Sequence, residues 1–245
     1  MAIKKTELIE IKNLEMVDVP VKIVGTSPLI MHAWSAKAKR QILEKEFGNL
    51  IKKMKEPRNP AEDFASSMYW LTPMPDELTY ESVEKALETA RFGFPVTAFK
   101  KAAISAAYRM GWTENMVSLR GAFFIVPDTN MYYSGNLVIS PDHKQIDIIP
   151  NTPVRMPMVE IHSDPPIMRE DPVVLGGMSR SADLRYRGEF NNWSATLTVR
   201  YNRSGRYSLE HILNFINAGG FVNGVGDWRP EKDGENGTFK VDTGN

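Results

Sequence analysis

The C-terminal part of the chain holds the pattern that most constrains the fold. Residues 193–201 alternate apolar odd positions with polar even positions, which is the period of a strand with one buried face. Residues 209–218 carry apolar side chains at helical spacing, and Gly219 and Gly220 are predicted to end this helix. A glycine-rich loop then leads to residues 237–241, whose apolar alternation predicts a closing strand. We therefore expect a β-α-β unit that forms half of the fold.

The preceding residues can supply the other half of such a fold. Residues 17–24 show the same alternation, and the apolar run at 122–126 predicts a buried strand. Helices are predicted at 35–54, 61–71, 79–91 and 98–110, and short strands at 136–139 and 146–149. No repeat or linker divides the chain. The sequence thus predicts an α+β protein with a ferredoxin-like, RNA-recognition-motif-like core, in a single domain over residues 1–245.

Residues 152–189 form a segment without sustained periodicity. It is rich in proline, including Pro165 and Pro166, and it contains the pair Gly176 and Gly177. Irregular segments of this length inside compact domains are uncommon and usually functional. We therefore expect a long irregular insertion that projects from the core.

The overall composition excludes several classes of function. The 30 basic residues balance 30 acidic ones, so no global field would attract nucleic acid or a membrane, and any basic site must be local. The absence of cysteine excludes disulfides and thiolate metal sites. No apolar run has the length of a membrane span or of a signal-peptide core. We expect a soluble, cytoplasmic protein with no membrane partner.

Catalytic and metal-binding signals are weak. The histidines lie far apart in the sequence, at His32, His143, His162 and His211, and no metal-binding or phosphate-binding motif is present. We therefore predict no metal, no cofactor and no catalytic site. His32 is the best candidate for an acid–base group in the event that the chain is an enzyme.

Basic side chains interleaved with aromatic ones give the strongest functional signal. Single-stranded nucleic acid is held by Lys and Arg along its backbone and by aromatic or arginine planes under its bases. The candidates are Lys37, Lys39 and Arg40; Lys100, Lys101 and Arg109; Arg180, Arg185, Tyr186 and Arg187; and Trp228 and Arg229. Each group alone is more often a solvated surface, but together they favour nucleic-acid binding.

Three segments, in this order, resemble those of one family. Residues 25–31 look like a strand that runs into a small-Pro-Leu sequence. Residues 93–107 are similar to a Pro-x-Ser-x-(Leu/Phe)-Lys-x-(Ala/Gly) helix, and residues 224–241 look like a glycine-rich loop with its closing strand. These are motifs of the RAMP superfamily, the ferredoxin-like RNA-binding subunits of CRISPR effector complexes. The resemblance is greatest to the backbone subunits that polymerise along a guide RNA.

The resemblance implies roles for particular segments. It implies that the helix capped by Thr97 faces RNA phosphate, that residues 152–189 form a thumb on the guide–target duplex, and that the chain assembles with itself and with other effector subunits. The chain departs from the family in its C-terminal loop, where four acids stand in place of a basic cluster, at Asp227, Glu231, Asp233 and Glu235. It also lacks the aspartate that RNA-cleaving members carry after the first strand, so aspartate-dependent cleavage is not expected.

Three hypotheses for the function follow. The leading one is a non-catalytic subunit that binds single-stranded nucleic acid, RNA rather than DNA, and self-associates along the strand. The second is a structural or interaction protein of a mobile element that reuses the same fold for protein contacts, with the methionine-rich loop as an adaptable interface. The third is a metal-independent ribonuclease that uses His32 or His162 as a general acid–base.

Overall fold

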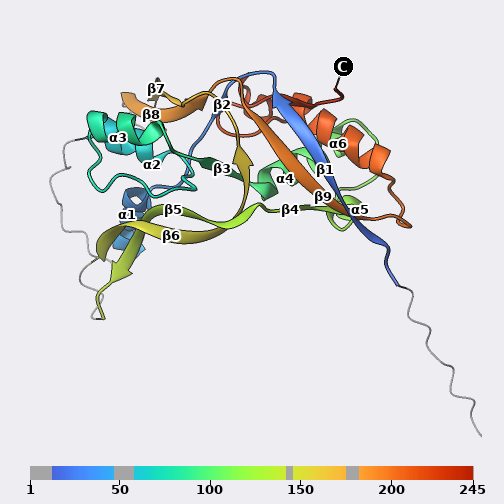
Figure 1. The fold of residues 1–245 in the computed structure, drawn as a ribbon, viewed down its shortest axis with the longest axis horizontal. Helices are drawn as coiled ribbons and strands as arrows, with labels where there is room; N and C mark the ends of the chain where they lie inside the picture. Colours follow the sequence, from blue (N-terminus) through green and yellow to red (C-terminus); the bar gives the residue numbers. More distant parts are fainter. Residues whose placement is uncertain (1–12, 47–57, 142–145, 175–181, 245) are drawn as a thin grey trace, which may run out of the picture.

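The computed structural model describes residues 13–46, 58–141, 146–174 and 182–244. Its four-stranded sheet has the order β10-β1-β9-β4, and every neighbouring pair is antiparallel (Figure 1). The strands are β1 (Met16–Gly25), β4 (Phe123–Val126), β9 (Ser194–Asn202) and β10 (Phe239–Val241). The strands predicted at 17–24, 122–126 and 193–201 are confirmed, and the closing strand is shorter than predicted.

The two longest described helices lie in the connections between strands of this sheet. Helix α4 (Val96–Arg109) lies between β1 and β4 in the chain, and α6 (Leu209–Val222) connects β9 to β10. Since β1 and β4 are both antiparallel to β9, they run parallel to each other. Strands β9 and β10 are both antiparallel to β1, so they also run parallel to each other. Two β-α-β connections therefore interleave within one sheet.

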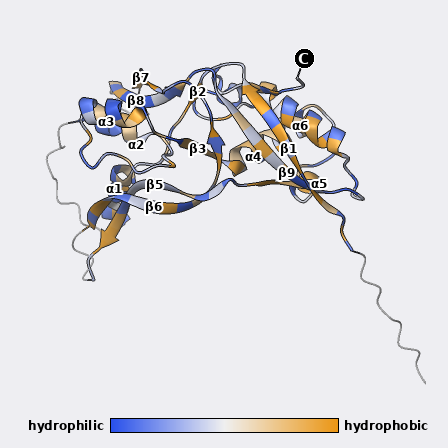
Figure 2. Cartoon of the chain, viewed as in Figure 1, coloured by the Kyte–Doolittle hydropathy of each residue, from blue (hydrophilic) through white to orange (hydrophobic). Residues whose placement is uncertain are grey.

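One face of this sheet is buried and the other is open. Ile23 of β1 and Leu197 of β9 are fully buried, whereas Lys22 beside Ile23 is exposed. The buried face joins α4 and α6 in one core, where the rings of Phe99 and Phe239 lie 5.7 Å apart between centroids. The alternation of hydrophobic and hydrophilic residues can be followed along β1 and β9 in Figure 2. It has the two-residue period of strands because successive side chains point to opposite faces.

Helix α6 does not end at Gly219 and Gly220, so that prediction is wrong. The helix continues to Val222 because its backbone meets two neighbours at the glycines. A Cβ at Gly219 would stand 2.7 Å from the backbone nitrogen of Ala103 in α4, and one at Gly220 would overlap the carbonyl oxygen of Phe239 in β10. The glycines thus allow close packing inside the helix instead of a left-handed cap.

Two smaller antiparallel sheets have the strand orders β3-β6-β5 and β2-β8-β7. Their strands are β2 (Leu29–Ile30), β3 (Phe92–Pro95), β5 (Thr129–Ile139), β6 (Ile146–Ile161), β7 (Ile167–Val174) and β8 (Ala182–Phe190). The short strands predicted at 136–139 and 146–149 are parts of the long β5 and β6, which pair with each other at the lower left of Figure 1.

Strands β6, β7 and β8 occupy most of residues 152–189, so the prediction of an irregular insertion is wrong. The prolines of this segment lie where a strand tolerates them. Pro157 lies at an irregularity in the pairing of β5 with β6, and Pro172 lies on β7, which is at the edge of its sheet. A proline without an N–H group does not interrupt the pairing at such positions.

The shorter helices are α1 (Ala36–Glu46), α2 (Pro60–Ser66), α3 (Tyr80–Leu87), α5 (Val117–Arg120) and the 3₁₀ turn Pro230–Lys232. Helix α2 ends earlier than predicted because Trp70 instead forms β-bridges with Phe92 and Tyr133. Helix α3 begins after its cap residue Thr79, whose hydroxyl accepts a hydrogen bond from the backbone of Ser82. The predicted helix at 35–54 extends beyond the described residues.

The buried apolar side chains of these elements form a core that includes residues from Val21 to Phe239. The combination of helices with antiparallel sheets confirms the α+β class. Of the helices that the structure describes, none has the length and apolar character needed to cross a membrane.

Candidate functional site

A groove of about 950 Å³ lies between α4 and the loop at residues 223–232. The basic residues that line it are Lys100, Lys101, Arg120, Arg229 and Lys232, and the acidic ones are Asp227 and Glu231. Thr97 and two aromatic side chains, Tyr69 and Phe94, also line the groove. The structure therefore brings together predicted site residues from α4 and from the C-terminal loop.

Helix α4 presents its N-terminal half to the groove. It begins at Val96 after Pro95, so Thr97 lies inside the first turn and the prediction that Thr97 caps the helix is wrong. Proline cannot donate a backbone hydrogen bond and its restricted φ suits a position just outside a helix. Lys101 is exposed and makes no hydrogen bond or ion pair with any other described residue. Its ammonium group is thus available to a ligand.

Lys100 is not available in the same way. Its Nζ donates a hydrogen bond of 2.7 Å to the carbonyl oxygen of Arg120 and lies 4.0 Å from the ring centroid of Phe124, a favourable cation–π contact. Burial lowers the pKa of Lys100. Lys100 therefore holds the end of α5 against α4, which places Arg120 at the groove.

The loop at residues 223–229 is shaped by contacts with β2. The backbone N–H of Asp227 donates to the carbonyl oxygen of Ile30 at 2.9 Å. Gly226 has a φ of 81°, and a Cβ there would stand 2.8 Å from the side chain of Leu29. Only glycine combines this left-handed backbone with so close an approach. The glycines of the loop thus seat it on β2 and fix the position of Asp227.

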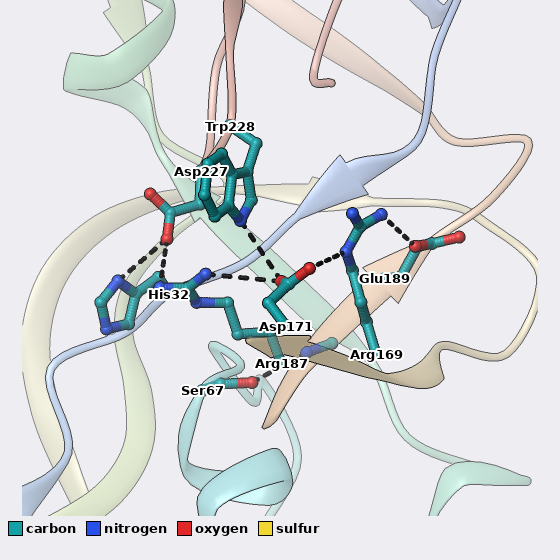
Figure 3. Close-up of polar contacts among 9 residues, drawn as sticks. His32, Ser67, Arg169, Asp171, Arg187, Glu189, Asp227 and Trp228 are labelled. Atoms are coloured by element: carbon teal, nitrogen blue, oxygen red, sulfur yellow. Dashed lines mark hydrogen bonds and ion pairs between the residues drawn. The ribbon is translucent and has the colours of Figure 1, made fainter. Parts of the chain in front are cut away.

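Asp227 belongs to a chain of charges around a buried arginine (Figure 3). The side chain of Arg187 on β8 is 4% exposed, and its Nη2 lies 2.8 Å from Oδ2 of Asp227. Its Nη1 lies 3.6 Å from Oδ2 of Asp171 on β7. Nδ1 of His32 lies 3.2 Å from Oδ2 of Asp227. The guanidinium of Arg187 therefore joins the β7–β8 pair to the C-terminal loop, and Asp227 joins this loop to His32, two residues after β2.

The same chain of charges extends along β7 and β8. Arg169 donates from Nε to Asp171 at 2.7 Å and from Nη1 to Glu189 at 3.0 Å. The indole Nε1 of Trp228 donates to Oδ2 of Asp171 at 3.3 Å. The charges are thus compensated among themselves, as burial requires. Figure 3 shows Trp228 and Arg187 directed at the same carboxylate.

The environment of Asp227 has opposing effects on its pKa. Burial disfavours the charged carboxylate, but the hydrogen bond from His32 and the charge of Arg187 outweigh it and hold the pKa of Asp227 below its usual value. A carboxyl whose pKa is lower in the folded than in the unfolded state stabilises the fold above its unfolded pKa of about 4, and this contribution is lost as the pH falls through the folded pKa.

The variant Asp227→Asn is therefore expected to be less stable than the wild type at neutral pH, and this difference is expected to shrink as the pH falls below about 4. Urea denaturation at a series of pH values measures the free energy of unfolding for both proteins. Glu84→Gln, an exposed carboxylate on α3, serves as the control and is expected to follow the wild type throughout. A difference between Asp227→Asn and wild type that does not vary with pH would contradict this account.

Other predicted site residues do not line the groove. Lys37, Lys39 and Arg40 are on α1, which packs against the β5–β6 pair, where Gly135 faces Ala36. Arg109 lies at the C-terminal end of α4, with its Nη2 3.8 Å from Oε1 of Glu231. Arg180 lies outside the described residues. The α1 cations thus line neither the groove nor its immediate surroundings.

The three predicted residues of β8 have different environments. Tyr186 lies under the guanidinium of Arg58, 5.7 Å from the ring centroid. Arg187 is buried, so it does not offer its charge to the solvent. Arg185 makes no hydrogen bond or ion pair with another described residue. All three lie in strand β8 and not in an irregular segment.

The two predicted loop residues are both held by acids. Arg229 donates to Glu231 from Nε at 3.0 Å and from Nη2 at 2.8 Å. Trp228 is 39% exposed and is tethered to Asp171 by its indole nitrogen. The acids of this loop, which argued against phosphate binding from the sequence, thus neutralise its arginine.

Comparison with known proteins leaves the chain without a family. No protein-family model matches it, and no curated protein matches it significantly. In the part of the chain that the structure describes, His, Asp and Glu side chains do not gather in any group of three that could hold a metal ion. The assignment to RAMP proteins and the role of the site residues therefore stay predictions.

Sequence reasoning missed Arg120 and Lys232, which line the groove, and the ion pair of Arg187 with Asp227. Arg120 and Lys232 stand in short segments without periodicity or motif. Arg187 and Asp227 lie in different elements, and no spacing in the sequence relates them. A pairing across the fold of this kind is visible only in three dimensions.

Proposed function

We propose that the protein is a non-catalytic subunit that binds single-stranded nucleic acid, RNA rather than DNA, in the groove beside α4. One observation carries the proposal: Lys101, Arg120 and Lys232 line the groove, are exposed, and form no ion pair with other described residues. Exposed cations around a groove suit a phosphate backbone. Tyr69, which is partly exposed in the lining, supplies apolar surface for a base.

The open face of the four-stranded sheet is a weaker candidate for the same ligand. RNA-recognition motifs stack bases on this face through aromatic residues. Here two of its cations are already paired, because Arg200 binds Asp18 through two hydrogen bonds of 2.7 Å and Lys22 lies 2.9 Å from Asp242. Cations already neutralised in this way offer less to phosphate, which favours the groove.

We further propose that the core is ferredoxin-like and that the chain is a RAMP-type backbone subunit. The strand order β10-β1-β9-β4 with its two interleaved β-α-β connections supports this core. The sequence segments at 25–31, 93–107 and 224–241 support the family. A protein of this type assembles with itself along the strand and with other effector subunits.

Lys101→Ala is expected to weaken the binding of a single-stranded RNA of about 30 nucleotides several-fold at low salt. Because one phosphate contact is lost, the dependence of log K on log salt is expected to become shallower by about 0.7. Fluorescence anisotropy across a salt series measures both quantities. Lys22→Ala, a lysine on the open sheet face, is the matched control and is expected to bind as the wild type does.

Two results of this experiment would count against the proposal. Absence of RNA binding by the folded wild-type protein at low salt would overturn it and favour the interaction protein of a mobile element. Equal weakening of RNA binding by Lys101→Ala and Lys22→Ala would show that the binding site is not the groove. Tighter binding of DNA than of RNA would show that the ligand is DNA, while the groove would stay the proposed binding site.

The ribonuclease remains a second candidate because of one contact. His32 lies 3.2 Å from Asp227, which can hold its ring in place, and His32 also lines the groove. Such an orienting carboxylate is common beside acid–base histidines. Recovery of shortened RNA from the binding reaction without added metal would support this candidate, whereas intact RNA supports a binding subunit.

A further inference from the structure

A second, smaller hollow lies on the other side of His32. Its volume is about 150 Å³, and its lining includes Arg58, Arg185, Arg187, His32, Ser35 and Ser66. Asp63 is the one acid that lines it. His32 lines both this arginine hollow and the groove, so the two are neighbours. Three arginines against one aspartate make the lining of the arginine hollow basic.

Arg187 is incompletely satisfied in this position. Its side chain is 4% exposed, yet its Nε and Nη1 are buried and have no hydrogen-bond partner among the described residues. Its acidic neighbours Asp171 and Asp227 do not line the hollow. A buried N–H group without an acceptor costs about 1–3 kcal/mol, more when it is charged. The positive charge of Arg187 lies at the lining of the hollow and favours an anion there.

The other cations of the hollow differ in how far they are already neutralised. The guanidinium of Arg58 lies 2.5 Å from a carboxylate oxygen of Asp63 and 2.5 Å from one of Asp183. The charges of Arg58 and Asp63 therefore neutralise each other. Arg185 forms no ion pair with any residue that the structure describes. The hydroxyl of Ser35 accepts a bond from the backbone of Ala38 at 3.2 Å and keeps its own proton to donate. The hollow thus offers unengaged donors from Arg185 and Ser35, beside the buried charge of Arg187.

We propose that the arginine hollow binds a phosphate group. Phosphate is a small anion with enough acceptor oxygens to bind Arg185 and a serine hydroxyl together, and the charge of Arg187 beside them favours it further. The site deepens the proposed function and rests on it in one respect: the phosphate is taken to belong to the strand that lies in the groove. A nucleic acid that passes His32 would place one phosphate in the hollow and its neighbours along α4.

The test compares Arg185→Gln with Arg203→Gln, an exposed arginine in the turn after β9 whose side chain has no partner among the described residues. Both variants are expected to fold as the wild type does, since neither loses an ion pair. Binding is measured with RNA strands of about 20 nucleotides, longer than a single compact binding site. One strand carries a 5′-phosphate and a matched one a 5′-hydroxyl. A third arm measures the melting temperature in inorganic phosphate against chloride at equal ionic strength.

Arg185→Gln is expected to weaken RNA binding about tenfold, the effect of losing one charge-assisted hydrogen bond, while Arg203→Gln has no effect. A loss confined to the 5′-phosphorylated strand identifies a terminal phosphate, and an equal loss for both strands identifies a phosphate within the chain. Wild-type affinity for Arg185→Gln, together with weakened binding by Lys101→Ala, would overturn the phosphate site and leave the proposed function intact.

The melting temperatures in inorganic phosphate distinguish the outcomes that follow when the wild type binds no RNA. If the wild type binds no RNA but phosphate raises its melting temperature, and not that of Arg185→Gln, the phosphate site stands without the proposed function. If the wild type binds no RNA and phosphate raises neither melting temperature, both are overturned.

Discussion

Arg187→Ala is expected to lower the free energy of unfolding by about 3 kcal/mol, the largest single effect that the structure indicates. The substitution leaves Asp171, which is 9% exposed at its side chain, with Arg169 as its charged partner and with the hydrogen bond from Trp228, and it leaves Asp227 with His32. A carboxylate that loses a charged partner in a region of low dielectric constant is costly because water cannot replace that partner. Urea denaturation at neutral pH measures the change.

The pair formed by Arg200 and Asp18 provides the control for this expectation. It has two hydrogen bonds of 2.7 Å, but its side chains are 47% and 41% exposed. Surface ion pairs contribute about 0–1 kcal/mol because water and salt screen them. Arg200→Ala is therefore expected to change stability little. A similar loss in both variants would show that burial of Arg187 does not decide its contribution.

Gly220→Ala is expected to destabilise the protein by about 2 kcal/mol or more, although alanine is the better helix former. In an isolated helix the substitution would gain about 1 kcal/mol. Here the added Cβ overlaps the carbonyl oxygen of Phe239, and this atom belongs to the backbone of β10 and cannot rotate away. Helix α6 must therefore shift from β10, with the cost of overpacking. Thermal or urea denaturation measures the net effect.

Gly121→Ala is the matched control for this substitution. Gly121 follows α5 with a φ of −96°, and a Cβ there would have no atom within 4 Å. This variant is expected to keep wild-type stability or to be more stable by up to about 1 kcal/mol, because alanine lowers the conformational entropy of the unfolded chain. If Gly220→Ala were as stable as Gly121→Ala, the close contact between α6 and β10 would not exist in the folded protein.

The candidate site could be predicted from the sequence only in part. Lys101 and Thr97 were found because an alanine-rich helix with adjacent lysines is a local pattern, and both line the groove. Lys37 and Arg40 form an equally clear local pattern, but their helix packs against β5 and β6 instead. A charge pattern indicates an exposed face of a helix, and it does not indicate which other surface that face adjoins.

The sequence by itself determined the strands of the central sheet, the approximate positions of α3, α4 and α6, and the α+β class. These follow from side-chain periods of two residues in strands and 3.6 in helices, which depend on neighbours in the chain. Only the tertiary structure decided that Gly219 and Gly220 lie inside α6, that residues 152–161, 167–174 and 182–189 pair as strands, and that Arg187 is buried against Asp227. Each of these depends on residues that are far apart in the sequence and come within a few ångströms of each other in the fold. Local sequence patterns do not show which distant residues meet in this way.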